Sequence, residues 1–373
     1  MHHLTRPRLT FAALALTCAL LPAPAPALAG GPTPASPPAA TATLTPVTTP
    51  LTDDAPSWRH AVAAHSDERV DVLEVTAHSP AMGRDVPLVV ITPTGDAPRP
   101  TIYLLNGADG GEGSANWIDQ SDVLDFYADK NVTVVIPMAG AFSYYTDWLE
   151  PAPDLGGVQK WETFLTEELP GPLEDRFHGN GQRAVAGISM SATSSLLLAQ
   201  HHPGFYRAVG SMSGCAATTT GAGNFGLGLT LQRGGATPEM MWGPVDGPVF
   251  REHDALINAE RLRGTEIFLS NGSGLAGPWD LPSSPYLAGQ TQQQASESMA
   301  TTIGVGGAIE AASNSCTHDL KAKLDSLGIP ADVDFTDVGT HTWGYWQDAL
   351  RSSWPTFARA FNMADDLAGG VEP

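Results

Sequence analysis

Residues 181–215 read GQRAVAGISMSATSSLLLAQHHPGFYRAVGSMSGC and contain a short apolar run, a lone serine and a helix-forming segment. The apolar run Ala184–Ile188 indicates a buried strand, and the composition of Met190–His202 indicates a helix. The chain must therefore turn sharply at Ser189, as in a nucleophile elbow, where a strained turn lifts the serine hydroxyl above the sheet. An ordinary Gly-Ser turn that opens a helix is the alternative, because Ser191 stands where the G-x-S-x-G pattern has its second glycine.

Strand-like apolar runs alternate with helix-like segments along most of the chain, with no internal repeat. This alternation predicts one doubly wound α/β domain with a mainly parallel sheet and helices on both faces. Two segments rich in Gly, Pro, Ser and Gln, Gly221–Asp254 and Gly272–Gly307, are expected as insertions over the carboxyl ends of the strands. The predicted strands are 70–78, 85–92, 101–105, 132–137, 184–188, 208–212, 266–270 and 333–338. The predicted helices are 121–130, 160–177 with a break or kink at Pro170, 190–202, 308–327 and 344–362.

The first 29 residues have the features of a secretory signal peptide. Two arginines precede the apolar run Phe11–Leu21, and Ala27-Leu28-Ala29 supplies a small-x-small cleavage site. Residues 30–56 are mostly Pro, Thr, Ala and Ser, which predicts a flexible or extended linker. The α/β domain is then expected over residues 57–365, in a protein secreted or held in the cell envelope.

The net charge of the 373-residue chain is −21 at pH 7. Nucleic acids and anionic membrane surfaces require basic partners, so this charge argues against both. A solvated acidic surface on an exported protein is the simpler interpretation. No apolar run after the signal peptide is long enough to cross a membrane, so we expect no transmembrane segment in the mature protein.

Cys215 and Cys316 are the two cysteines that follow the predicted signal peptide, which contains Cys18. In an exported protein such a pair favours a disulfide over a metal site. The bond would fasten the segment after one strand to a later helix. No cluster of cysteine or histidine has the spacing of metal ligands, so no metal is expected.

A serine becomes a nucleophile when a base accepts its proton and an acid orients that base. In folds with a nucleophile elbow the three follow in the order Ser, Asp or Glu, and His. His341 follows the last predicted strand, where the base belongs, whereas His253 and His318 do not; a surface loop histidine is the alternative. The acid should follow the penultimate strand, and the pattern leaves four candidates open: Asp280, Glu297, Glu310 and Asp319.

The oxyanion hole of such an enzyme needs two backbone N–H donors. One is expected from Met190, directly after the serine, and the other from the loop after the third strand. That loop reads Asn106-Gly107-Ala108, and its glycine lets the backbone come close. The Ala108 N–H is therefore the expected second donor, with a plain tight turn as the alternative.

Several longer motifs accompany the elbow. They are LLNG at 104–107, YYTDW at 144–148, KWETFLTEELP at 160–170, GISMS at 187–191, MWGP at 241–244 and GTHTWGYW at 339–346. Together they resemble the antigen 85 and corynebacterial mycolyltransferase family of secreted α/β-hydrolases, over roughly residues 65–355. SGC at 213–215, LRGT at 262–265 and CTH at 316–318 make the corynebacterial branch the most similar.

The resemblance implies a role for each candidate residue. Ser189 is the expected nucleophile, His341 the base and Glu310 the acid, with Ala108 and Met190 as oxyanion donors. The CTH motif strengthens the Cys215–Cys316 disulfide. Asn106 and Trp343 are expected in substrate-binding positions. The chain has NGAD where antigen 85 proteins have DGLR, so Asn106 replaces a carboxylate and Asp109 an arginine that contact the sugar.

The function implied by the resemblance is acyl transfer without a cofactor. The expected donor is trehalose monomycolate, and the acceptor is a hydroxyl of trehalose, arabinogalactan or a protein serine in the cell envelope. One alternative is a secreted carboxylesterase or carbohydrate esterase that hydrolyses its substrate. Others are a catalytically idle envelope-binding protein and a lysophospholipase-like enzyme, and oligomeric state is open.

Overall fold

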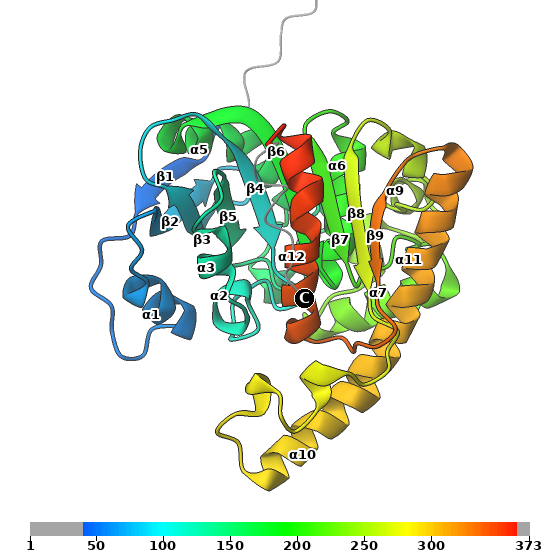
Figure 1. Cartoon of the computed structure of the whole chain (residues 1–373). Coiled ribbons are helices and arrows are strands. Elements are labelled where there is room, and N and C mark those ends of the chain that lie inside the picture. Colours follow the sequence, from blue (N-terminus) through cyan, green and yellow to red (C-terminus); the bar gives the residue numbers. More distant parts are fainter. Residues whose placement is uncertain (1–39, 364–373) are drawn as a thin grey trace, which may run out of the picture. The chain divides into compact units, whose positions relative to one another are not determined.

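The computed structural model describes residues 40–363. These residues are arranged around a nine-stranded sheet (Figure 1). The strand order is β1-β2-β3-β5-β4-β6-β7-β8-β9. The first three strands are antiparallel to their neighbours, and β4 to β9 pair with each other in parallel. The strands are β1 Thr43–Pro46, β2 Val70–Ser79, β3 Arg84–Pro93, β4 Arg99–Leu105, β5 Thr133–Pro137, β6 Gly179–Ile188, β7 Ala208–Met212, β8 Glu266–Asn271 and β9 Asp332–Phe335.

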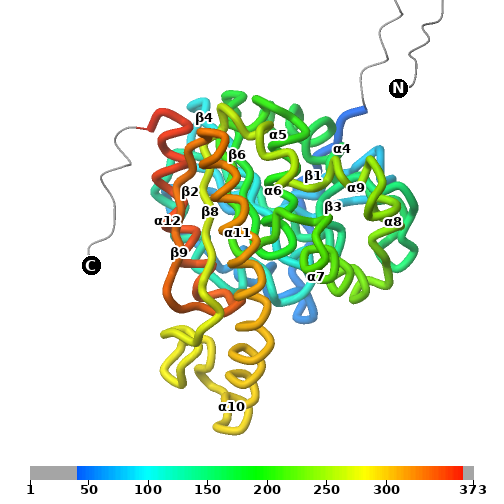
Figure 2. The backbone as a smooth tube through the Cα atoms, turned by 90° about the vertical axis from the view of Figure 1, so that its right-hand side faces the viewer, coloured from blue at the N-terminus to red at the C-terminus, as the bar shows by residue number. Residues whose placement is uncertain are grey.

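The central strands are apolar on both faces because helices cover both sides of the sheet. Along β4, Tyr103 and Leu105 belong to one buried cluster, whereas Ile102 and Leu104 belong to the other. Helical segments between residues 161 and 262 and the helix around Leu320 contribute to the first cluster, and those around Trp58, Trp117, Val123 and Trp354 contribute to the second. Figure 2 shows the two helical layers from the side. The predicted doubly wound, mainly parallel α/β sheet is thus confirmed.

The helices that build these layers have the following bounds. The α-helices are α1 Ser57–Ala64, α2 Trp117–Gln120, α3 Val123–Tyr127, α4 Trp161–Thr163, α5 Pro170–Phe177, α6 Met190–His201, α7 Gly221–Arg233, α8 Pro238–Trp242, α9 Pro248–Glu252, α10 Gln292–Thr301, α11 Gly307–Leu327 and α12 Trp343–Ala360. The short 3₁₀ segments are η1 Pro153–Leu155, η3 Ala259–Leu262, η4 Pro278–Asp280 and η5 Pro285–Leu287, and the π-helical turns are η2 Phe164–Glu168 and η6 Thr302–Gly306. The π-turn η2 lies directly before Pro170, where the sequence predicts a helix break.

The two predicted insertions contain more helix than their composition suggests. Residues 221–254 form α7, α8 and α9, and residues 272–307 contain α10 and η6. Figure 1 shows α10 and the start of α11 projecting beyond the sheet, at the edge where β8 ends. The helix predicted over 121–130 is shorter than expected, because only Val123–Tyr127 is helical there.

The N-terminal boundary of the domain needs a correction. Thr43–Pro46, inside the predicted linker, forms β1 and pairs with Val75–His78 of β2. Ala42 is buried, and its N–H donates to the carbonyl oxygen of Glu168. The sheet therefore begins before residue 57, because backbone pairing with β2 and the packing of Leu44 against the core hold this edge strand in place. The predicted signal peptide and its cleavage site lie outside the described residues.

Between residues 40 and 363, no helix is both long enough and apolar enough to span a membrane.

The predicted disulfide between Cys215 and Cys316 is confirmed. It links the segment after β7 to α11, across 101 residues of sequence, with the two Cα atoms 5.0 Å apart. The carbonyl of Cys215 also accepts a hydrogen bond from Thr193 of α6. The bond therefore ties α11 to the centre of the sheet, close to the helix that follows Ser189.

We expect the double variant Cys215→Ser, Cys316→Ser to lower the free energy of unfolding by about 2–5 kcal/mol, because a closed loop of this size restricts the unfolded chain. Guanidinium titration followed by circular dichroism measures the change. Reduction of the wild-type protein should give the same loss. An unchanged midpoint in both experiments would show that the bond contributes nothing to stability.

Candidate active site

Ser189 lies in a strained turn between β6 and α6. Its backbone has φ 54° and ψ −116°, a conformation that non-glycine residues rarely adopt. The turn also requires a glycine two residues earlier, since a Cβ on Gly187 would lie 2.2 Å from the carbonyl oxygen of Ser191. Ser189 remains partly exposed while its neighbours Ile188 and Met190 are buried. The hydroxyl is therefore presented at the end of the strand, as the elbow pattern predicts.

Ser191 explains the departure from the G-x-S-x-G pattern. Its side chain is fully buried, and its Oγ accepts a hydrogen bond from the N–H of Ile188 at 2.9 Å. The same hydroxyl lies 3.2 Å from the carbonyl oxygen of Leu105, at the end of β4. A small polar residue thus fits the turn and fastens it to the neighbouring strand.

His341 lies between Ser189 and Glu310. Its Nε2 is 2.7 Å from Ser189 Oγ, and its Nδ1 is 2.7 Å from Glu310 Oε2. His341 comes from the loop between β9 and α12, and Glu310 from the first turn of α11. The structure therefore brings together the three side chains that the sequence order suggests.

The other acid candidates lie elsewhere. Asp280 contacts Thr340 and Tyr345, not His341. Glu297 on α10 and Asp319 on α11 are exposed. Of the four carboxylates, Glu310 alone hydrogen-bonds to the imidazole.

Three donors hold the second oxygen of Glu310, and sequence reasoning missed all of them. Oε1 accepts from Ser213 Oγ at 2.8 Å, from Asn271 Nδ2 at 2.8 Å and from the N–H of Gly272 at 2.7 Å. The glutamate side chain is 1% exposed, so these bonds compensate for the loss of water around the carboxylate. Ser213 and Asn271 lie at the carboxyl ends of β7 and β8. Ligands bind at this edge of a parallel sheet, so polar residues at strand ends are a sequence signal that could have identified both donors.

A second buried carboxylate holds the loop of His341. Asp280 accepts from Thr340 Oγ1 at 2.6 Å, from Tyr345 OH at 2.6 Å and from the N–H of Gly277 at 2.9 Å. Burial and the bond to Asp280 both raise the pKa of Tyr345, which therefore remains a phenol donor. Asp280 thus holds Thr340, directly before His341, and Tyr345, four residues after it.

The two expected oxyanion donors flank the elbow. The loop of Ala108 approaches β6, because a Cβ on Gly107 would lie 3.7 Å from the side chain of Ile188. Among residues 40–363, no hydrogen bond uses the backbone N–H of Ala108 or of Met190. Both donors are thus free to bind an oxygen next to Ser189.

Asn106, expected in a substrate-binding position, makes contacts only within the protein. The side chain is fully buried: its Nδ2 donates to the carbonyl oxygen of Pro137 at 2.8 Å, and its Oδ1 accepts from the N–H of Trp117 at 3.0 Å. Asn106 therefore holds the loop of Ala108 in place. Trp343 is half-buried, with its ring edge-to-face against Trp117, and remains available as a substrate contact.

Comparison with known proteins identifies relatives along most of the chain. A family model described as "putative esterase" matches residues 79–357. Diacylglycerol acyltransferase/mycolyltransferase Ag85A of Mycobacterium tuberculosis H37Rv is 33% identical over 297 residues, 78% of this chain and 81% of the relative. Diacylglycerol acyltransferase/mycolyltransferase Ag85B of Mycolicibacterium smegmatis is 30% identical over 292 residues, 75% of this chain and 82% of the relative.

Solved structures give the same picture. MPT51 (FbpC1) of Mycobacterium tuberculosis superposes with a TM-score of 0.61 at 26% identity, covering 76% of this chain and 96% of that one. FphF, a fluorophosphonate-binding serine hydrolase of Staphylococcus aureus, superposes with a TM-score of 0.54 at 16% identity, covering 77% and 98%. The second likeness concerns the fold alone, and both agree with the expected α/β-hydrolase fold. The chain therefore belongs to the putative esterase family and, within it, to the family of the antigen 85 proteins.

Proposed function

We propose that this protein is a serine acyltransferase, with Ser189 as nucleophile, His341 as base and Glu310 as orienting acid. The observation that carries the proposal is the pair of 2.7 Å contacts on the two nitrogens of one imidazole. A base held between a hydroxyl and a buried carboxylate is the arrangement that activates serine in acyl transfer. The names of the antigen 85 relatives support the same reaction class.

The chemistry proceeds through an acyl-enzyme. Ser189 Oγ attacks the ester carbonyl while its proton moves to His341 Nε2, and His341 then protonates the leaving hydroxyl. The negative oxygen of each tetrahedral intermediate accepts from the N–H groups of Ala108 and Met190, each worth about 3 kcal/mol. An acceptor hydroxyl then gives its proton to His341 and takes the acyl group, which regenerates the serine.

The proposed donor is trehalose monomycolate, and the proposed acceptors are hydroxyl groups of trehalose, arabinogalactan or a protein serine. Apolar side chains beside the site support a lipid donor: Ile303, Val305 and Ile309 are exposed, on η6 and the start of α11. This segment approaches the base, since a Cβ on Gly306 would lie 3.5 Å from the backbone nitrogen of His341. The predicted signal peptide and the disulfide support a place in the secreted or envelope fraction.

Hydrolysis is the second candidate reaction. Water can replace the acceptor hydroxyl, and the same three side chains would then release a free acid. Ser189 is partly exposed, which favours access by water. The ratio of transfer to hydrolysis therefore depends on how well the bound acceptor excludes water, and a test must measure both products.

We expect Glu310→Gln to lower kcat by about 10⁴-fold. The amide oxygen of the variant stays with its three donors, so its NH₂ group faces His341 Nδ1. His341 must then accept at Nδ1 and carry its proton on Nε2, where it cannot take the proton of Ser189. Steady-state turnover of a p-nitrophenyl ester measures the loss, and Glu297→Gln, a change to an exposed residue of α10, is the matched control.

Near-normal turnover by Glu310→Gln would assign the acid role to another carboxylate. The thermal midpoint of the variant should stay close to that of the wild type, which separates a lost proton acceptor from a lost fold.

Incubation with trehalose monomycolate tests the proposed transfer. Mass spectrometry should detect trehalose dimycolate, and further mycolyl esters when other hydroxyl acceptors are added. Ser189→Ala should give neither product nor acyl-enzyme, because the attacking oxygen is missing.

Two other results would contradict transfer in different ways. Free mycolate without any diester would establish the hydrolase alternative. An unconsumed donor, together with no labelling of Ser189 by an active-site phosphonate, would indicate an envelope-binding protein without catalysis.

A further inference from the structure

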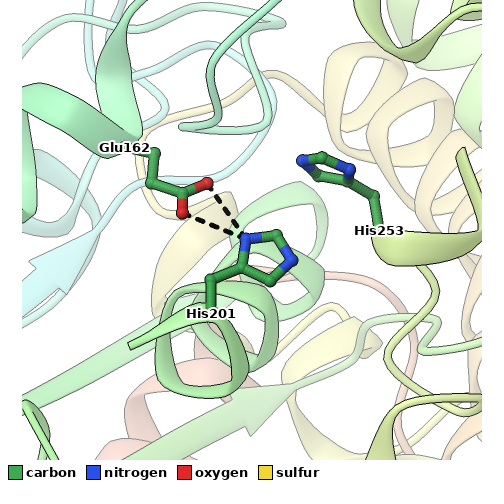
Figure 3. Close-up of side chains that lie close together, drawn as sticks. All are labelled: Glu162, His201 and His253. Carbon is green, nitrogen blue, oxygen red and sulfur yellow. Dashed lines mark hydrogen bonds and ion pairs between the residues drawn. The ribbon is translucent and has the colours of Figure 1, made fainter. Parts of the chain in front are cut away.

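A second cluster of chemically reactive side chains lies at the far end of α6 from Ser189. Glu162 on α4, His201 at the end of α6 and His253 after α9 each direct one potential ligand atom inward (Figure 3). These three atoms all lie within 4.8 Å of one another. Since α6 has 12 residues, the cluster is about 18 Å from the nucleophile along the helix axis. The acyl-transfer reaction therefore makes no use of it.

The outer nitrogen of each histidine faces a backbone carbonyl. His201 Nε2 lies 3.2 Å from the carbonyl oxygen of Glu252, and His253 Nδ1 lies 2.8 Å from that of Val249. His201 Nδ1 also donates to the carboxylate of Glu162, so a cation that replaces this proton would meet lone pairs on the inner nitrogens of both rings. Histidines that bind metals commonly have this arrangement, since a carbonyl fixes the tautomer and the ring orientation.

The inner nitrogens both face Glu162. His201 Nδ1 lies 3.0 and 3.1 Å from the two carboxylate oxygens. Figure 3 shows the His253 ring with one nitrogen turned toward the same carboxylate, and within residues 40–363 no hydrogen bond uses His253 Nε2. Two imidazole nitrogens and one carboxylate oxygen therefore converge on one point.

Neighbouring groups hold the cluster in position. His202 Nε2 lies 2.9 Å from Glu162 Oε1 and can donate to it, which leaves the other oxygen for a ligand. The buried ring of Trp242 stacks on His253, with centroids 4.6 Å apart. The side chains of His201 and Glu162 are only 10% and 16% exposed. Little side-chain freedom remains to be lost when a ligand binds.

We propose that Glu162, His201 and His253 form a site for a divalent transition-metal cation such as Zn²⁺, with water as the fourth ligand. Two imidazoles and a carboxylate suit zinc, whereas magnesium and calcium take oxygen ligands. Ligand atoms around tetrahedral zinc lie about 3.3 Å apart, so the three atoms, which lie within 4.8 Å of one another, come closer together when the cation binds. The cation also neutralises the carbonyl end of the α6 dipole and joins α4, α6 and α9.

Isothermal titration of the metal-free protein with ZnCl₂ tests this site directly. We expect one equivalent bound, with a rise in Tm of about 5–10 °C at a hundredfold excess over Kd. His253→Gln and Glu162→Gln should each weaken zinc binding at least tenfold. His60→Gln, which alters an exposed histidine of α1, is the control and should bind like the wild type.

Zinc binding by both cluster variants at the affinity of the wild type would overturn the proposal, and so would less than one equivalent bound by the wild type. If Glu162→Gln does not fold, His253→Gln decides, because the one hydrogen bond of the His253 ring within residues 40–363 is to the Val249 carbonyl. Ester turnover is not the readout, so failure here is distinguishable from failure of the acyltransferase assignment.

Discussion

The backbone conformation of Ser189 is the constraint on which the rest of the site depends. A residue held at φ 54° and ψ −116° costs roughly 1–3 kcal/mol, so the surroundings must enforce it. Gly187 permits the close approach of the helix, and the hydroxyl of Ser191 bonds to the turn and to β4. The strain leaves the hydroxyl exposed and frees the N–H of Met190. Both consequences serve attack on an ester carbonyl.

The parallel sheet solves the problem of bringing distant residues to this turn. His341 lies 152 residues from Ser189 and 31 from Glu310 in sequence, yet each contact is 2.7 Å. Because neighbouring parallel strands all end at one edge, loops far apart in the chain meet there. The same edge supplies Ser213 and Asn271, whose hydrogen bonds hold the buried side chain of Glu310 in place. Polar groups at the strand ends thus position the charged side chains of the site, and the buried strands stabilise the fold.

The sequence predicted those elements whose signal is local. Fully apolar runs such as Val132–Pro137 mark buried strands, and the lone serine marks the elbow, because burial on two faces and a sharp turn each leave a compositional trace. The edge strand β1 left no such trace, since its partner β2 lies about 30 residues away and its own side chains are mostly exposed. The sequence pattern left four carboxylates, Glu310 among them, as candidates for the acid that orients His341. Which of them reaches the histidine depends on how α11 packs. The burial of Asn106 was missed for the same reason, since it is a property of the fold.

The helix α6 runs from the active site, where it follows Ser189, to the histidine cluster at its other end. Every residue of α6 except His201 is buried, so the helix behaves as a rigid rod inside the larger core cluster. Its first turn carries Ser191, bonded to β4, and its last residue is bonded to Glu162 of α4. A helix held at both ends cannot shift along its axis, and a misplacement of about 1 Å at a catalytic site can cost about a hundredfold in rate. The contact between His201 and Glu162 thus fixes the far end of the helix whose first residue follows Ser189.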